Sequence, residues 1–211
     1  MRRGKSKVLM MTSIILAGGR ASRLEARDKA FLEIDNEPII KRQLRKLKSL
    51  SQEVIIVSNS PDNYKGLKEV KVVSDIIPNC GPLGGIYSGL LASRDDYNFI
   101  VACDMPFIDS ALIQYMHKNA YGYDIVVPRI YNRYEPLFCI YSKKCLKYIK
   151  ELLDKKVFKI STFFSEVMVR EITENEVVQF TAPEKVFINV NTQEDLKRIN
   201  GYYVYTQSRQ D

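Results

Sequence analysis

Short runs of apolar, mostly β-branched residues recur along the chain, and polar residues bound each of them. Runs of this kind are typical of strands that are buried on both faces of a parallel sheet. The five clearest runs lie at 12–16, 53–58, 70–74, 99–103 and 123–127. Two later runs, at 135–141 and 186–190, predict further strands.

The stretches between these runs carry apolar residues at helical spacing. Ile40, Leu44 and Leu47 fall on one face of a helix predicted over 38–50, and Pro38 suits its first turn. Further helices are predicted at 83–92, after Asp109 as an N-cap, at 144–153 and at 192–198. Strands that alternate with helices predict an α/β fold, a three-layer α/β/α sandwich around a mostly parallel sheet with right-handed crossovers.

Length and rhythm predict one domain. A chain of 211 residues can bury a substantial core. We expect a basic extension at 1–10, followed by a single domain at 11–211. The strand–helix rhythm is regular over 11–128 and changes over 129–211, which divides the domain into two halves.

Composition excludes two common kinds of active site. His117 is the only histidine, and the four cysteines contain no Cys-x-x-Cys pair. The usual zinc sites and any mechanism built on Ser-His-Asp or Cys-His are therefore excluded. Free thiols in a reducing cytoplasm are the simplest account of the cysteines, so we expect a cytoplasmic protein.

The formal charge of +7 suits an anionic small molecule as well as it suits nucleic acid. No block of lysine and arginine resembles a nucleic-acid-binding tail. No apolar stretch is long enough to span a bilayer. We therefore expect a small-molecule substrate, with neither nucleic acid nor a membrane as partner.

The loop after the first predicted strand has the residues expected of a triphosphate-binding loop. Gly18 and Gly19 let the backbone approach phosphates and turn its N–H groups toward them, while Arg23 and Lys29 bring positive charge. The spacing matches neither a P-loop nor a dinucleotide-binding fingerprint. A glycine pair alone would favour an ordinary turn.

Polar residues follow several other predicted strands. In open α/β sheets ligands bind at the carboxyl ends of strands, and Asn59, Asp75 and Asp104 all stand there. Asp104 suits a Mg²⁺ ligand that bridges to phosphate oxygens, and its alternative role is to cap the next helix, for which Asp109 is better placed.

Asp75 precedes the glycine-rich segment 81–90 and can accept hydrogen bonds from N1–H and the 2-amino group of guanine. The alternative for that segment is close packing of Gly84, Gly85 and Gly89 on the sheet. The two interpretations are compatible, because a helix can pack by one face and bind a ligand at its end.

Two further sets of residues have open roles. Asn189 and Asn191 either supply neutral oxygens to a metal or acceptor, or belong to a helix start that Thr192 and Asp195 cap. Arg129 and Arg133 either grip an acceptor phosphate or are solvated charges.

Four motifs together resemble the molybdenum cofactor guanylyltransferases, the molybdopterin-guanine dinucleotide biosynthesis protein A family of the nucleotidyltransferase superfamily. They are Leu-Ala-Gly-Gly with a later Arg and Asp-Lys, Gly-Pro-Leu-x-Gly-Ile, Cys-Asp-x-Pro-Phe, and Asn-x-Asn-Thr-x-Glu-Asp-Leu. They stand here at 16–29, 81–86, 103–107 and 189–196, so the resemblance covers nearly the whole chain after residue 11.

The resemblance implies a Rossmann-like nucleotidyltransferase fold and a GTP site. By residue match, the family's nucleotide contacts fall on Leu16, Ala17, Gly18, Lys29, Asn59, Asp75 and Asp104, with Asp104 also as the Mg²⁺ ligand. The catalytic residues would be Arg23, Lys29 and Asp104. As candidate acceptor contacts we take Asn189, Asn191 and Arg129, with 11–128 as the nucleotide-binding half and 129–211 as the acceptor-binding half.

The implied reaction transfers GMP from GTP to the terminal phosphate of molybdenum-loaded molybdopterin, which yields molybdopterin guanine dinucleotide and pyrophosphate. Mg²⁺ is the implied cofactor. Other proteins of cofactor biosynthesis or molybdoenzyme maturation are implied as transient partners.

The chain departs from the family at Leu24-Glu25-Ala26, where the family's arginine is usually followed by Met-Gly. Loss of the glycine restricts the loop, and Glu25 adds negative charge near a triphosphate. Two alternatives stay open. One is a nucleotidyltransferase with another acceptor, such as a molybdopterin cytidylyltransferase or a cobinamide or sugar-phosphate enzyme, and the other is a non-catalytic nucleotide-binding relative.

Overall fold

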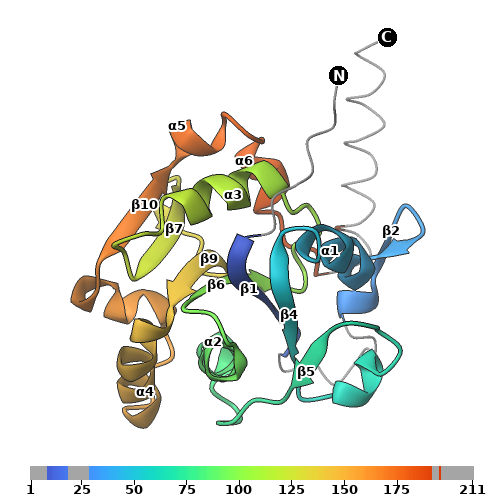
Figure 1. Cartoon of the computed structure of the whole chain (residues 1–211), viewed down its shortest axis with the longest axis horizontal. Helices are drawn as coiled ribbons and strands as arrows, with labels where there is room; N and C mark the ends of the chain where they lie inside the picture. Colours follow the sequence, from blue (N-terminus) through green and yellow to red (C-terminus); the bar gives the residue numbers. More distant parts are fainter. Residues whose placement is uncertain (1–8, 19–28, 192–194, 196–211) are drawn as a thin grey trace.

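The computed structural model describes residues 9–18, 29–191 and 195. Eight strands form one sheet in the order β10-β7-β9-β6-β1-β4-β5, with β8 paired to β7 (Figure 1). The strands are β1 (Leu9–Leu16), β4 (Ser51–Val57), β5 (Lys71–Val73), β6 (Tyr97–Ala102), β7 (Ile125–Ile130), β8 (Arg133–Tyr134), β9 (Phe138–Ser142) and β10 (Val169–Thr173). A short hairpin, β2 (Glu33–Ile34) and β3 (Glu37–Pro38), stands apart from this sheet.

Helices cover both faces of the sheet, which confirms the predicted three-layer α/β sandwich (Figure 1). Four lie on one face: α1 (Ile39–Leu47), α3 (Ser110–Lys118), α5 (Glu174–Val177) and α6 (Pro183–Val186). Two lie on the other: α2 (Gly81–Ala92) and α4 (Leu146–Asp154). Short 3₁₀ turns at Lys29–Phe31, Pro61–Tyr64, Lys143–Cys145 and Ile160–Glu166 complete the described segments.

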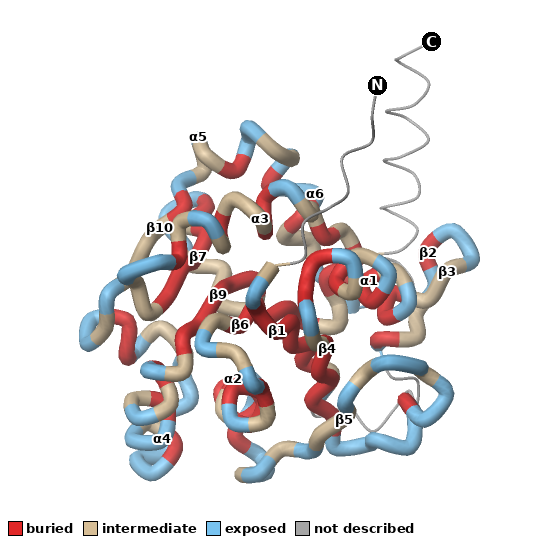
Figure 2. The backbone as a smooth tube through the Cα atoms, in the orientation of Figure 1, coloured by how far each residue is buried: buried red, intermediate tan, exposed pale blue. Residues whose placement is uncertain are grey.

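The alternation of side chains along the central strands divides the core in two. Ile15 of β1 belongs to the cluster under α1 and α3, whereas Ile14 belongs to the cluster under α2 and α4. Both side chains are fully buried. Figure 2 shows the consequence, with the central strands buried along most of their length between partly exposed helices.

The sheet is mainly parallel, as predicted. β1 pairs in parallel with β4 and β6, β4 with β5, and β7 with β10. The exception is β9, which runs antiparallel to both β6 and β7. Strands from both halves of the sequence thus join one sheet, because β9 fills the space between β6 and β7.

One predicted element is wrong. The run at 186–190 is not a strand: α6 ends at Val186, and residues 187–190 have no regular structure. Its apolar side chains pack on the core instead. The Phe187 ring lies edge-on to the Phe138 ring with 5.4 Å between the ring centroids, and Val190 is fully buried against the β2–β3 hairpin and α1. An apolar run needs burial, and sheet pairing is only one way to obtain it.

The remaining predicted boundaries shift by a few residues. β1 begins at Leu9, so Leu9 and Met10 belong to the sheet although they fall within the predicted extension. The weakly periodic segment 155–182 contains β10, α5 and a 3₁₀ turn. The predicted helix at 192–198 lies outside the described residues apart from Asp195.

The structure also shows the state of the cysteines and the character of the helices. Cys80, Cys103, Cys139 and Cys145 are free thiols. Among the helices that the structure describes, none combines the length and apolar character needed to cross a membrane.

Candidate functional site

The parallel strands β1, β4, β5 and β6 end at one edge of the sheet, and their following loops carry the predicted site residues. Gly18 follows β1, Asn59 follows β4, Asp75 follows β5 and Asp104 follows β6. Backbone hydrogen bonds tie these loops to neighbouring strands. Ala17 donates to Val57 at 2.9 Å, which extends the pairing of β1 and β4 to the start of the glycine loop.

Asn59 and Asp75 form the first part of the site. The Asn59 side chain donates from Nδ2 to Asp75 Oδ2 at 3.0 Å and accepts from the Asp75 backbone N–H at 3.1 Å. Asp75 Oδ1 is buried and has no hydrogen-bond partner among the described residues. Burial raises the pKa of the Asp75 carboxyl, and the hydrogen bond from Asn59 opposes this rise. The result is a fixed carboxylate with one unused oxygen, suited to a ligand that donates hydrogen bonds.

The glycines of α2 pack closely on β1 and on the Asp75 loop. A Cβ on Gly89 would lie 2.6 Å from Ile14 Cγ2, and one on Gly85 would lie 3.2 Å from Leu16 Cδ2 and 3.7 Å from Asp75 Oδ1. The packing interpretation of this segment is therefore confirmed. Among the described residues no side chain caps the helix start at Cys80, and Pro82 has no N–H, so the Gly81 N–H is the first that α2 can offer to a ligand near Asp75.

Asp104 lies in a turn that backbone hydrogen bonds hold on several sides. Cys103 donates to Leu16 at 3.0 Å, Met105 donates to Ala102 at 3.2 Å, and the Asp104 carbonyl accepts from Val190 at 2.8 Å. The carboxylate, in contrast, has a buried oxygen, Oδ1, for which the described part of the chain offers no hydrogen-bond partner. Burial raises the pKa of Asp104, and the charge of Lys29 partly offsets the effect.

The alternative role of Asp104 as a helix cap is filled by Asp109. The Asp109 side chain accepts from the Leu112 backbone N–H at 2.9 Å and caps α3. Asp104 is therefore not needed to start that helix.

Lys29 and Asn191 are brought together although 162 residues separate them. Lys29 Nζ donates to Asn191 Oδ1 at 2.6 Å, and both residues are exposed. Each has a buried neighbour in the chain, Ala30 for the lysine and Val190 for the asparagine. The Asn191 backbone also donates to Asp195 Oδ2 at 2.9 Å. Asn189 is exposed on the other side of Val190.

The donor set fits a hard divalent cation that is shared with a substrate. The described residues contain no cluster of three or more His, Cys, Asp or Glu side chains that could enclose a metal. Mg²⁺ commonly binds through one or two carboxylates and takes its other ligands from water and substrate phosphates. The unpartnered Oδ1 of Asp104 provides one such carboxylate oxygen.

Arg129 is separated from this cluster. It lies on β7, and β9 stands between β7 and β6 in the sheet. Its guanidinium donates to both carboxylate oxygens of Glu171, at 3.1 and 2.9 Å, and lies over the Tyr134 ring with 5.5 Å to the centroid. Arg133 is exposed on β8. Gly19 and Arg23 lie outside the described residues.

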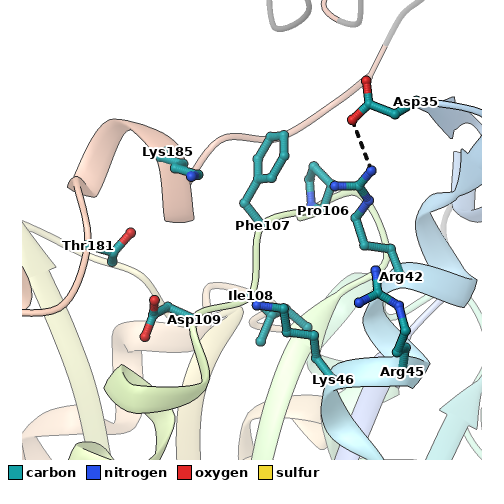
Figure 3. A pocket seen from close by; sticks show the side chains of 10 residues that line it. All are labelled: Asp35, Arg42, Arg45, Lys46, Pro106, Phe107, Ile108, Asp109, Thr181 and Lys185. Carbon is teal, nitrogen blue, oxygen red and sulfur yellow. Dashed lines mark hydrogen bonds and ion pairs between the residues drawn. The ribbon is translucent and has the colours of Figure 1, made fainter. Parts of the chain in front are cut away.

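A hollow of about 260 Å³ opens beside the Asp104 turn and was not indicated by the sequence (Figure 3). Its wall combines cations of α1 with the segment that follows Asp104, and its lining residues are Asp35, Arg42, Arg45, Lys46, Pro106, Phe107, Ile108, Asp109, Thr181 and Lys185. Acidic neighbours offset part of its positive charge, since Arg42 pairs with Asp35 at 3.2 Å and Arg45 with Glu37 at 2.9 Å.

Sequence reasoning also missed Gln43. Its side chain is fully buried and contacts the backbone of the Asp104 turn. The available signal was its position, because it is a polar residue on the apolar face that Ile40, Leu44 and Leu47 define.

Known proteins share this chain's sequence and fold. Residues 13–169 match the model of the MobA-like NTP transferase domain. The "Probable molybdenum cofactor guanylyltransferase" of Pelotomaculum thermopropionicum is 40% identical over 190 residues, which cover 90% of this chain and 91% of that protein.

Two solved structures share the fold. The molybdopterin-guanine dinucleotide biosynthesis protein A from Archaeoglobus fulgidus superposes with a TM-score of 0.77 at 20% identity, over 92% of this chain and 100% of that one. The manganese complex of Rv0371C from Mycobacterium tuberculosis superposes with a TM-score of 0.60 at 15% identity, over 90% and 97% of the two chains. On the family match and the sequence identity, the chain belongs to the MobA-like NTP transferase family.

Proposed function

We propose that this protein transfers GMP from GTP to the terminal phosphate of molybdenum-loaded molybdopterin, forming molybdopterin guanine dinucleotide and pyrophosphate. Membership of the family and the name of the relative that is 40% identical support the reaction class and the acceptor. The observation that carries the proposal is the pair of fixed carboxylates, Asp75 and Asp104, at one edge of the sheet, each with a buried, unpartnered oxygen among the described residues.

The two carboxylates fit different parts of GTP. Asp75 Oδ1 can accept from N1–H and the 2-amino group of guanine, whereas adenine and cytosine do not present this pair of donors. Asp104 Oδ1 would hold Mg²⁺, which when bound neutralises phosphate charge and orients the triphosphate. The glycine loop from Leu16 to Gly19 would present its N–H groups to the phosphates.

The chain supplies positioning and charge, with no covalent nucleophile. Lys29, which donates to Asn191 at 2.6 Å, would meet charge that develops as pyrophosphate leaves, and Arg23 would join it from the loop. The acceptor phosphate attacks the α-phosphorus of GTP in line. We assign Asn189, Asn191 and Arg129 to the acceptor, with 129–211 as the acceptor-binding half and 11–128 as the nucleotide-binding half. The free cysteines support a cytoplasmic location.

Pyrophosphate release by the purified protein, with molybdopterin and Mg²⁺, tests the proposal. GTP should support turnover, while CTP and ATP should not, and Asp104→Ala should be inactive with all three. Turnover with CTP would indicate a cytidylyltransferase instead. Nucleotide binding without turnover on molybdopterin, cobinamide phosphate or sugar phosphates would indicate the non-catalytic alternative.

A further inference from the structure

The Gln43 side chain connects α1 to the turn that carries Asp104. Its Nε2 donates to the carbonyls of Ala102 and Met105, each at 2.8 Å, and the residue is fully buried. Because both neighbours are carbonyl oxygens and can only accept, the amide nitrogen must face them, which fixes the orientation of the amide.

The two carbonyls lie on either side of Asp104 in the chain. Ala102 is the last residue of β6, and Met105 follows Asp104 directly. With the carbonyl of Asp104 itself bonded to Val190 at 2.8 Å, three backbone oxygens of the turn have defined partners. Among the side chains that the structure describes in this turn, the Asp104 carboxylate has a buried oxygen without a hydrogen-bond partner.

Packing alone does not account for a glutamine at this position. Gln43 Oε1 is itself buried, and no described residue donates to it. A buried acceptor without a partner is unfavourable, and an apolar side chain of similar length would avoid that loss. The neighbouring Arg42 reaches the same segment, with its guanidinium carbon 5.9 Å from the centre of the Phe107 ring. Consecutive residues of α1 thus hold the turn by its backbone and by its following aromatic side chain.

We infer that Gln43 is a positioning residue that sets the Asp104 carboxylate for metal binding. This inference rests on the proposed role of Asp104 as the metal ligand. Groups that fix a metal ligand from behind commonly change metal affinity by about 10–100-fold when they are removed. Without Gln43, the carbonyls of Ala102 and Met105 would lose these hydrogen bonds, and the Asp104 carboxylate between them would no longer be held in one direction.

Mn²⁺ binding in the presence of GTP, measured by calorimetry or by the loss of the free-ion resonance, tests the inference without turnover. Gln43→Met keeps the length of the side chain and removes both donors, and we expect it to bind Mn²⁺ about tenfold more weakly. Leu47→Ala is the matched control. It removes buried volume from the same helix, and the leucine side chain makes no hydrogen bond to the turn. It should leave the Mn²⁺ affinity within about twofold of wild type while lowering the melting temperature.

Gln43→Glu provides the rescue. Position 43 is fully buried and faces two carbonyl oxygens, which raises the pKa of a carboxyl there. The protonated carboxyl can donate one of the two hydrogen bonds, so at pH 6 the variant should bind Mn²⁺ more tightly than Gln43→Met, and this advantage should shrink toward pH 8. Each affinity is compared with that of wild type at the same pH. If Gln43→Met does not fold, the test rests on Gln43→Glu alone: its Mn²⁺ affinity relative to wild type should be lower at pH 8 than at pH 6.

Equal Mn²⁺ affinity in Gln43→Met and wild type, or equal losses in Gln43→Met and Leu47→Ala, would overturn the inference. A Gln43→Glu variant that binds no better than Gln43→Met at pH 6 would do the same. Asp104→Ala separates this from the proposed function: if it binds Mn²⁺ as well as wild type does, the metal role of Asp104 itself is wrong. If Asp104→Ala loses Mn²⁺ and the Gln43 variants do not, only the positioning role fails.

Discussion

Removal of the Asp104 side chain should abolish activity and at the same time stabilise the protein without ligands. In the free protein the carboxylate is half-buried, its Oδ1 has no partner among the described residues, and burial raises its pKa. A buried acceptor without a partner costs about 1–3 kcal/mol. We expect the lower end, about 1 kcal/mol, because Lys29 offsets part of the penalty. For a chain of this length that corresponds to a rise in melting temperature of about 2–4 °C.

The sign of the pH dependence follows from the raised pKa. Between the ordinary aspartate pKa of about 3.9 and the higher folded value, the folded state holds the proton more tightly than the unfolded state. The stabilising contribution of the protonated group is thus present at low pH and is lost as pH rises through the folded pKa. The stability advantage of Asp104→Ala should therefore be present at pH 7 and should shrink as pH falls toward 4.

Asp109→Ala is the matched control, five residues further along the same segment. It removes the cap on α3, a 2.9 Å hydrogen bond to the Leu112 N–H, which should lower stability by about 1 kcal/mol while turnover is kept. Thermal melts with and without Mg²⁺ and GTP, together with pyrophosphate release, compare the two variants. An Asp104→Ala protein that is both inactive and less stable than wild type would mean that the residue holds the fold, and normal turnover would remove it from the site.

Three further changes test separate parts of the site. Asp75→Ala should reduce the preference for GTP over ATP and CTP in calorimetry, and an unchanged preference would remove the residue from base recognition. Lys29→Ala should lower kcat/KM about a hundredfold, or about 3 kcal/mol. Lys41→Ala, which removes an exposed lysine of α1, should change kcat/KM by less than about twofold. Similar losses for the two variants in steady-state kinetics would mean that Lys29 contributes only to a diffuse positive field. Gly89→Ala should lower the free energy of unfolding by about 1–3 kcal/mol, because its Cβ would lie 2.6 Å from a methyl group of β1, while Gly66→Ala, with no atom within 4 Å of its Cβ, should be nearly neutral by denaturant titration.

The sequence predicts the central strands because their burial leaves a local trace. β1, β4 and β6 lie in the middle of the sheet, so each carries a run of buried apolar residues, and this run is visible without knowledge of any neighbour. β10 leaves a weaker trace. It lies at the edge, and Val169, Arg170 and Glu171 are only half-buried there. The antiparallel direction of β9 also has no local signal, because direction depends on which strands it separates.

The same distinction applies to the site. Asn59, Asp75 and Asp104 could be predicted because the carboxyl ends of parallel strands meet at one edge, which makes their proximity a consequence of topology. The bond between Lys29 and Asn191 could not, since it depends on where two loops distant in sequence come to rest. The run at 186–190 has the composition of a strand, but composition does not show what covers it. Val190 packs against the β2–β3 hairpin and α1, donates to the Asp104 carbonyl and anchors the segment that holds Asn191.

Hydrogen bonds from neutral groups fix the loops that carry Asp75 and Asp104, and one buried oxygen of each carboxylate is left without a partner among the described residues. Asn59 holds Asp75 through its backbone N–H and through the other carboxylate oxygen, and Gln43, Leu16 and Val190 hold the Asp104 turn through main-chain groups. A cation paired directly with each carboxylate would have satisfied its oxygens, and it would then have competed with the ligand; the charge of Lys29 only partly offsets the rise in the Asp104 pKa. Burial raises the pKa of each carboxyl, and a bound base or cation can supply an interaction that favours its charged form. The two deficits differ in kind, because one is met by hydrogen-bond donors and the other by positive charge, and a nucleoside triphosphate that carries a divalent cation brings both in one molecule.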